Sequence, residues 1–315
     1  MTSWLALAIA ALALQAHAQF PARPITVVIP LAAGDAADTA SRAMGEELTR
    51  TLKQPVVAVN RPGAGGVVAA DSVVKAPKDG YTVLFAQNSA LTFRPVTERQ
   101  STPYEAERDL TPLGLASRTP SVLVVRADAP YRTLKELVEH ARSKPDSVRV
   151  GTPGEGSVAD FCVQLVNVLA EVKLVSVPFK GAAPSIAALR GGHIEAVVAA
   201  LGALSPHIKN GSFRALATSR RFPDFPDVPT LKELGYKQDM FGVWLAFLAP
   251  AGIPEEARAA LVPAIEQAVK SPAVAARLLP LGIVQDYRTP AQLAAEIREE
   301  SQLVQAVAKQ SGMLK

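Results

Sequence analysis

Two kinds of hydrophobic pattern alternate along most of the chain. Short apolar runs rich in β-branched residues, such as residues 25–30, are typical of buried strands. Between such runs, apolar residues recur at helical spacing, as Met44, Leu48 and Leu52 do within residues 38–52. Because strands that alternate with helices are typical of parallel sheets with crossover helices, the pattern predicts an α/β fold built from mainly parallel sheets flanked by helices.

The alternation is interrupted, and the interruption divides the chain. A second block of strands and helices begins near residue 121 and ends in the segment 222–230, where each proline removes a backbone donor that an inner strand needs. An apolar run at residues 243–248 leads back to the first block, whose last helix is predicted by a capping box from Thr289 to Gln292. A chain of 315 residues with 49% hydrophobic composition usually forms two domains. The expected division is lobe I, residues 19–121 and 242–315, and lobe II, residues 122–241.

The N-terminal segment is typical of a cleaved export signal. A run over residues 4–16 that is apolar except for Gln15 leads into Ala-His-Ala at 16–18, a pattern that signal peptidase reads, and the run is too short to anchor a protein in a bilayer. We expect a signal peptide over residues 1–18 and cleavage before Gln19, while the alternative is a buried N-terminal helix. The single cysteine, Cys162, provides neither a disulfide nor a lipid anchor at the cleavage site, so the expected location is the periplasm.

Charge and motifs argue against nucleic-acid binding and against catalysis. The net charge is +4, and lysines and arginines are interspersed with acids rather than gathered in runs. Nucleotide-binding glycine motifs, the GxSxG elbow and HExxH are all absent from the sequence, and His140, His193 and His207 are scattered. Cys162 lies between apolar neighbours and is expected to be buried rather than nucleophilic. We therefore expect no enzymatic activity, no cofactor and no metal.

Two loops that join a strand to a helix are the candidate ligand site. In open α/β sheets, ligands bind beyond the carboxyl ends of strands, where loops meet helix N-termini. The loops at residues 30–38 and 151–157 consist mainly of small residues whose backbone amides can face an anion. The alternative is that their glycines only permit tight turns and that Asp38 and Ser157 cap the following helices.

Short motifs along essentially the whole chain after residue 20 resemble those of the Bug family of extracytoplasmic solute receptors, the binding subunits of tripartite tricarboxylate transporters. The markers, in order, are PARPI at 21–25, QP at 54–55, NRPGAGG at 60–66, DGYT at 79–82, VPFKG at 177–181, PHIKNG at 206–211, DVPT at 227–230 and APAGIP at 249–254. Each is weak alone, but their order and spacing make the resemblance specific.

The resemblance implies a two-lobe periplasmic-binding-protein fold, also called a Venus flytrap, with a cleft between the lobes. It places a hinge of two crossing segments near residues 121–125 and 242–248. It also implies that the two loops grip a ligand carboxylate through backbone amides and ordered water. The candidate ligand-binding residues are Ala32, Ala33, Gly34, Asp35 and Asp38 in the first loop, Thr152, Gly154, Gly156, Ser157 and Asp160 in and after the second, and Asn88, Ser89, Gly181 and Ala182 elsewhere in the cleft.

Three acidic residues depart from the family pattern near this site. Asp35 and Glu155 stand where the family usually has a small residue, and Asp160 stands where it usually has a histidine. Carboxylates that faced the cleft would repel a carboxylate ligand. Two hypotheses stay open: these side chains point outward, or the ligand carries an amine or amide beside its carboxylate. The segment at residues 93–100 is also more charged than the family pattern.

The leading functional prediction is a periplasmic, monomeric solute-binding protein. It would close two lobes around a small organic acid or amino-acid-like ligand and be recognised by membrane transporter subunits. An alternative is an orphan receptor that presents its closed form to a sensor protein. A periplasmic enzyme is disfavoured, because no pairing of nucleophile and base is visible.

Overall fold

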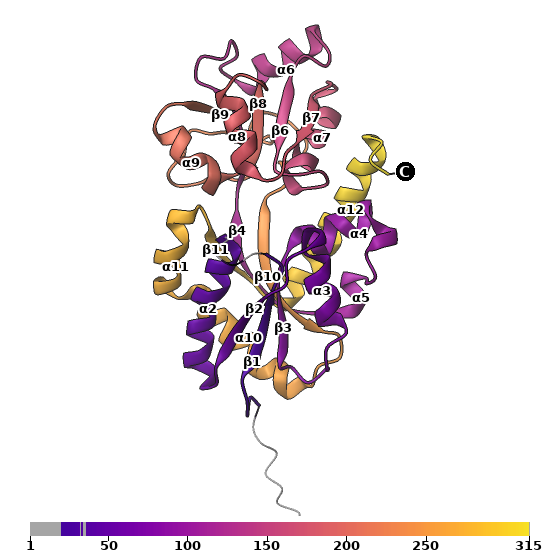
Figure 1. Ribbon diagram of the computed structural model, residues 1–315, viewed down its shortest axis with the longest axis vertical. Coiled ribbons are helices and arrows are strands. Elements are labelled where there is room, and N and C mark those ends of the chain that lie inside the picture. The colour runs from indigo at the N-terminus through magenta and orange to yellow at the C-terminus, as the bar shows by residue number, and fades with distance from the viewer. Residues whose placement is uncertain (1–19, 32, 34–35, 315) are drawn as a thin grey trace, which may run out of the picture.

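The chain folds into two lobes, each built on its own sheet (Figure 1). The structure is a computed structural model that describes residues 20–31, 33 and 36–314, so the predicted signal peptide lies outside the described residues. The lower lobe in Figure 1, lobe I, has a six-stranded sheet of order β11-β4-β10-β3-β1-β2. The upper lobe, lobe II, has a five-stranded sheet of order β7-β6-β8-β5-β9.

The sheet of lobe I is buried on both faces, which explains why its strands are continuous apolar runs. Along neighbouring strands, Val27 and Phe85 face one core cluster while Val28 and Leu84 face another. Helices α2, α10 and α11 cover the first face, and α3 and the start of α12 cover the second. The strands are β1 (Ile25–Ile29), β2 (Val56–Asn60), β3 (Thr82–Gln87), β4 (Leu110–Thr119), β10 (Val243–Pro250) and β11 (Val284–Arg288). The helices are α2 (Ala36–Leu52), η1 (Ala64–Gly66), α3 (Val67–Val74), η2 (Ser89–Phe93), α4 (Arg94–Thr97), η3 (Arg99–Ser101), α5 (Ala106–Asp109), α10 (Glu255–Lys270), α11 (Pro272–Leu278), η4 (Leu279–Leu281) and α12 (Pro290–Gln310).

Lobe II repeats this layered arrangement at smaller size. Leu123 and Val125 face a cluster formed with α6 and α7, whereas Val122 and Val124 face α8 and α9. Its strands are β5 (Ser121–Arg126), β6 (Arg149–Thr152), β7 (Val175–Pro178), β8 (Ala196–Ala200) and β9 (Phe213–Thr218), and its helices are α6 (Leu134–Ser143), α7 (Val158–Ala170), α8 (Ala182–Arg190) and α9 (Leu201–Lys209).

Both sheets are mixed, where mainly parallel sheets were expected. The strands that carry the expected crossover helices pair in parallel, namely β1 with β2 and β3, and β6 with β7 and β8. The strands that adjoin the crossings between lobes pair antiparallel: β10 with β3 and β4, and β5 with β8 and β9. The reason is that the chain must enter and leave each lobe through these strands, which periodicity alone does not reveal.

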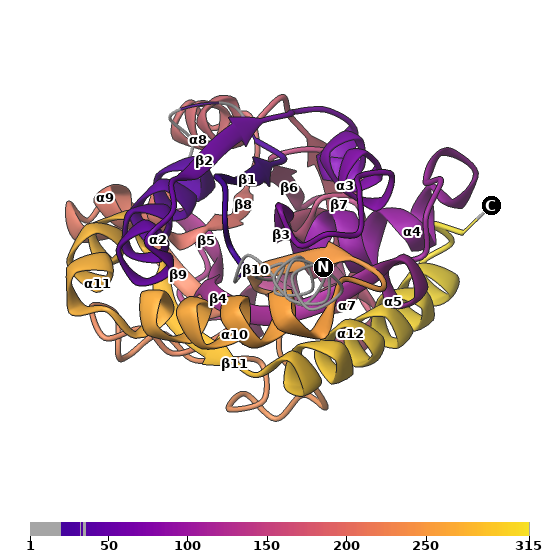
Figure 2. The ribbon, with the colours of Figure 1, turned by 90° about the horizontal axis from the view of Figure 1, so that it is seen from below.

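Two crossings and one helix connect the lobes. The chain passes from β4 to β5 at Pro120, and it returns from lobe II at Gly242, just before β10. Helix α12 begins at the capping box predicted from Thr289 and packs Ile297 into a lobe I cluster, but its later residue Val304 packs into the lobe II cluster. Seen from below, α12 runs along the side of the molecule that also carries α4 and α5 (Figure 2). No helix in the described part of the chain has the length and apolar character needed to span a bilayer.

Candidate functional site

The lobe I side of the candidate site is assembled where β1, β2 and β3 end. Ser89 Oγ, at the start of η2, donates to the carbonyl of Gly65 at 3.0 Å. A Cβ added at Gly66 would lie 3.0 Å from the Cβ of Ala90 and 3.2 Å from the Cβ of Pro30, so glycine is what allows these segments to meet. Ser89 therefore lies beside the NRPGAGG segment and beside the end of β1.

Asp38 anchors the first loop from within α2. Its carboxylate accepts hydrogen bonds from Arg42 Nε at 2.9 Å and from Asn60 Nδ2 at 2.9 Å, and Asn60 Nδ2 also donates to the carbonyl of Leu31 at 2.9 Å. These bonds tie the loop after β1 to the end of β2. Ala33 is exposed in this loop, whereas Ala32, Gly34 and Asp35 lie outside the described residues. A ligand contact by any of them stays a prediction.

The second loop is held in shape by its own chain. Ser157 caps α7 by accepting from the backbone N–H of Asp160 at 3.2 Å, which confirms the capping interpretation of Ser157. Asp160 is 5% exposed; its Oδ2 accepts from the N–H of Gly156 at 2.9 Å, and its Oδ1 accepts from Ser176 Oγ at 2.5 Å. Asp160 thus turns back into the loop, an orientation that neither hypothesis for the acidic residues included. Thr152, at the end of β6, is fully buried.

The remaining loop residues are placed beside the second loop. Gly181 donates its N–H to the carbonyl of Pro153 at 2.8 Å, so the loop before α8 is tied to the loop before α7. Ala182 begins α8 and is half-buried, as is Gly154. Glu155 is exposed and borders a cavity, so the hypothesis that this side chain points outward stays a prediction. The structure therefore gathers the lobe II candidates on adjoining loops at the ends of β6 and β7.

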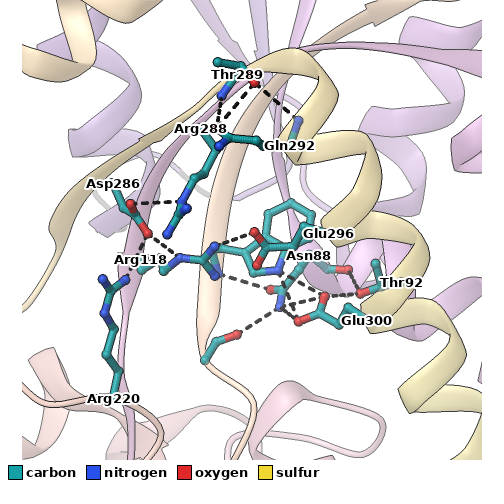
Figure 3. A network of polar contacts seen from close by, with 12 residues as sticks. Asn88, Thr92, Arg118, Arg220, Asp286, Arg288, Thr289, Gln292, Glu296 and Glu300 are labelled. Carbon is teal, nitrogen blue, oxygen red and sulfur yellow. Dashed lines mark hydrogen bonds and ion pairs between the residues drawn. The ribbon is translucent and has the colours of Figure 1, made fainter.

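Asn88 belongs to a different environment, the polar network between β10 and α12 (Figure 3). Its side chain is fully buried, donates to the carbonyl of Gly242 at 2.9 Å and to Glu300 Oε1 at 3.2 Å, and accepts from the N–H of Trp244 at 3.4 Å. These bonds use both ends of the amide. Asn88 therefore links the second crossing, at Gly242, to α12 by hydrogen bonds. A contact between Asn88 and a ligand stays a prediction.

Glu300 is the central acceptor of this network. Thr92 Oγ1 donates to it at 2.6 Å, and the indole Nε1 of Trp244 donates at 3.1 Å. The residue is half-buried and borders a cavity, and both of its carboxylate oxygens accept hydrogen bonds from surrounding donors. Burial raises the pKa of Glu300 to about 7, although the hydrogen bonds from Thr92, Asn88 and Trp244 act in the opposite direction.

An ionic cluster next to Glu300 joins the two lobes. Arg118, at the end of β4, bonds to Asp286 at 2.6 Å and to Glu296, and Arg220 of lobe II reaches the same Asp286 oxygen at 2.9 Å (Figure 3). Although burial alone raises it, the hydrogen bonds from Arg118 and Arg220 hold the pKa of Asp286 below its ordinary value. A cavity of about 780 Å³ between the lobes is lined by residues of this cluster and of both crossings.

The lobes also meet at their two flanks. Arg94 of α4 donates from Nη2 to the carbonyl of Glu155 at 3.4 Å and pairs with Glu98, and its side chain is only 19% exposed. A Cβ added at Gly202 of lobe II would lie 2.2 Å from the carbonyl oxygen of Leu281 in lobe I. The two lobes are therefore in contact on both sides of the crossings.

Sequence reasoning missed Arg94, Glu300 and the Arg118 cluster. A partial signal existed for Arg94, because the segment 93–100 was recognised as unusually charged. Glu300 gave no signal, since an acidic residue beside Glu299 on an amphipathic helix resembles a solvated one. Its environment depends on Asn88, which follows β3, and on side chains from η2 and β10, all more than 50 residues away along the chain.

Comparison with known proteins identifies the family. The family model described as the tripartite tricarboxylate transporter family receptor matches residues 40–313. The chain belongs to this family. It is 32% identical to the protein BugT of Bordetella pertussis over 295 residues, which is 93% of this chain and 90% of BugT. The resemblance to Bug receptors expected from the sequence motifs is confirmed.

Solved structures of relatives show the same fold. MatC from Rhodopseudomonas palustris, solved with bound malate, superposes with a TM-score of 0.76 at 32% identity, covering 91% of this chain and 99% of MatC. A second R. palustris protein, solved with adipate, gives a TM-score of 0.78 at 28% identity and covers 93% of this chain and 98% of its own. The two-lobe α/β fold is confirmed, and this receptor belongs to an extracytoplasmic family of solute-binding proteins.

Proposed function

We propose that this receptor captures a small carboxylate-bearing solute between its lobes and delivers it to the membrane subunits of a tripartite transporter. The observation that carries the proposal is the match to two relatives with bound malate and adipate over more than nine-tenths of the chain. The clustering of the small-residue loops at the ends of β1, β6 and β7 supports it, because ligands of open α/β sheets bind at such ends.

We propose hinge bending as the way the ligand is enclosed. Pro120 and Gly242 are the points where the chain crosses between lobes, so rotation there separates the loops of lobe I from those of lobe II. The contact between Arg94 and the carbonyl of Glu155 forms only when the lobes approach, and it would favour the closed form. A ligand shifts the population toward that form by binding it more tightly than the open form.

The proposed setting is the periplasm, reached through the predicted signal peptide. Presentation of the closed form to a sensor protein instead of a transporter is the second candidate, because both uses require the same closed form. Catalysis is not proposed, because the family to which the chain belongs is a family of receptors.

Isothermal titration calorimetry tests the proposal on protein that has been unfolded and refolded to remove any carried ligand. We expect one-to-one binding of at least one member of a panel of small carboxylates that includes malate and adipate. Ala33→Trp, an exposed change in the first loop, should weaken that binding at least about tenfold, whereas Ala259→Trp, exposed on α10, should not. A folded protein that binds no member of the panel would overturn the proposal.

A further inference from the structure

Lobe II already holds an anion at the helix end that faces its binding loop. The N-terminus of a helix carries a partial positive charge and backbone donors that favour a negative group. In the loop just before α7, the N–H of Gly156 serves the chain itself, because it bonds to the Asp160 carboxylate at 2.9 Å. The second oxygen of that carboxylate is taken by Ser176 Oγ at 2.5 Å.

The donors that hold Asp160 are uncharged, so they satisfy its hydrogen bonds without cancelling its charge. The basic side chains nearby do not offset this charge. Arg94, whose Cζ would lie 3.9 Å from a Cβ added at Gly156, pairs with Glu98, which balances its charge, although its buried Nε has no hydrogen-bond partner among the described residues. Lys180 on the adjoining loop is exposed. Glu155 on the same loop is exposed, so solvent screens its carboxylate. The loop is therefore an unfavourable place for a second anion.

We infer that Asp160 determines ligand specificity by excluding a carboxylate from the lobe II end of the cleft. The ligand is then a monocarboxylate whose acid group lies against lobe I and whose other end carries an uncharged or hydrogen-bond-donating group, such as an amide. This inference rests on the proposed function and narrows its ligand class. It separates this receptor from the two relatives solved with the dicarboxylates malate and adipate.

The test compares matched ligands on matched variants. The probes are succinate with its monoamide and adipate with its monoamide, pairs that differ only in whether the second end is charged. Asp160→Asn keeps both hydrogen bonds, because Oδ1 accepts from Gly156 and Nδ2 donates to Ser176 Oγ, and it removes the charge. Glu155→Gln removes a charge from the exposed side chain of the same loop and is the control. Thermal unfolding of each variant shows whether it is folded.

Calorimetry should show that the wild type binds a monoamide at least about tenfold more tightly than the matching diacid. Asp160→Asn should tighten diacid binding at least about tenfold and change monoamide binding less than about threefold, whereas Glu155→Gln should change both by less than about threefold. If Asp160→Asn does not fold, Asp160→Ala should change diacid binding in the same direction.

Two results overturn the inference. One is a wild type that binds a diacid as tightly as its monoamide, with no gain in Asp160→Asn; the proposed function then stands and only the specificity rule fails. The other is a wild type and a folded Asp160→Asn that bind none of the four probes. If some other member of the wider carboxylate panel still binds, the proposed function stands. If no member of that panel binds, the proposed function fails too.

Discussion

Replacing Glu300 with glutamine tests whether the enclosed carboxylate between α12 and the second crossing makes stability depend on pH. Burial raises the pKa of this group from an ordinary value of 4.5 to about 7. Glutamine has nearly the same shape, and its carbonyl oxygen can accept from Trp244 while its amide donates to Thr92 Oγ1. The variant therefore keeps the packing and loses the titration.

The raised pKa fixes the sign of the effect. The folded protein keeps the Glu300 proton up to about pH 7, whereas the unfolded chain releases it near 4.5. The stabilisation from this proton is complete below pH 4.5 and is lost as the pH rises through 7. With these two pKa values, linkage gives a loss of about 2 to 3 kcal/mol in the free energy of unfolding between about pH 5 and pH 8. Glu300→Gln lacks this loss.

The free energies of unfolding of the wild type and of Glu300→Gln are measured in urea over this pH range. The difference between them removes the contribution of the other titrating groups. Trp244 is the reporter, because the chain has 2 tryptophans and the other, Trp4, lies in the predicted signal peptide. Glu299→Gln, an exposed change on the same helix, is the control and should follow the wild-type curve. If the free energy of unfolding changes with pH in the same way in the wild type and in Glu300→Gln, the reasoning is refuted.

Three further changes test the contacts between lobes. Arg220→Ala breaks the pair with Asp286, but Arg220 is 51% exposed, so the free energy of unfolding should fall by no more than about 1 kcal/mol in urea titrations. Gly202→Ala places a methyl group against the Leu281 backbone and should cost about 1 to 3 kcal/mol by the same measurement; a neutral effect would contradict the close approach. Phe93→Ala removes the lobe I ring that packs on two lobe II phenylalanines, costs about 3 to 5 kcal/mol, and should separate the unfolding of the lobes into two transitions.

The elements that the sequence predicted are those with local signals. The capping box at Thr289 begins α12, and the apolar run at residues 25–30 forms the buried strand β1. The small-residue loops were found in the same way, since they follow strands and precede helices. Local spacing was sufficient because each of these features is set within a few residues.

The features that the sequence left open depend on contacts between distant segments. The direction of Asp160 is set by Ser176 on β7, and the enclosure of Glu300 is set by β10 and η2. Helix α12 was assigned wholly to lobe I, yet Val304 packs into lobe II because the helix is long enough to extend past the crossings. Periodicity shows which face of a helix is apolar, but not which lobe that face meets.

Single-molecule energy transfer between the lobes tests the central claim, that a small carboxylate is enclosed by lobe closure. Arg61 and Lys180 are exposed beyond the ends of β2 and β7, and cysteines there can carry the dyes because Cys162 is buried. The ligand is a carboxylate that has been shown by calorimetry to bind. On titration with it, we expect a shift to one population with a short distance between the dyes. An unchanged distribution of distances at saturating ligand would contradict it.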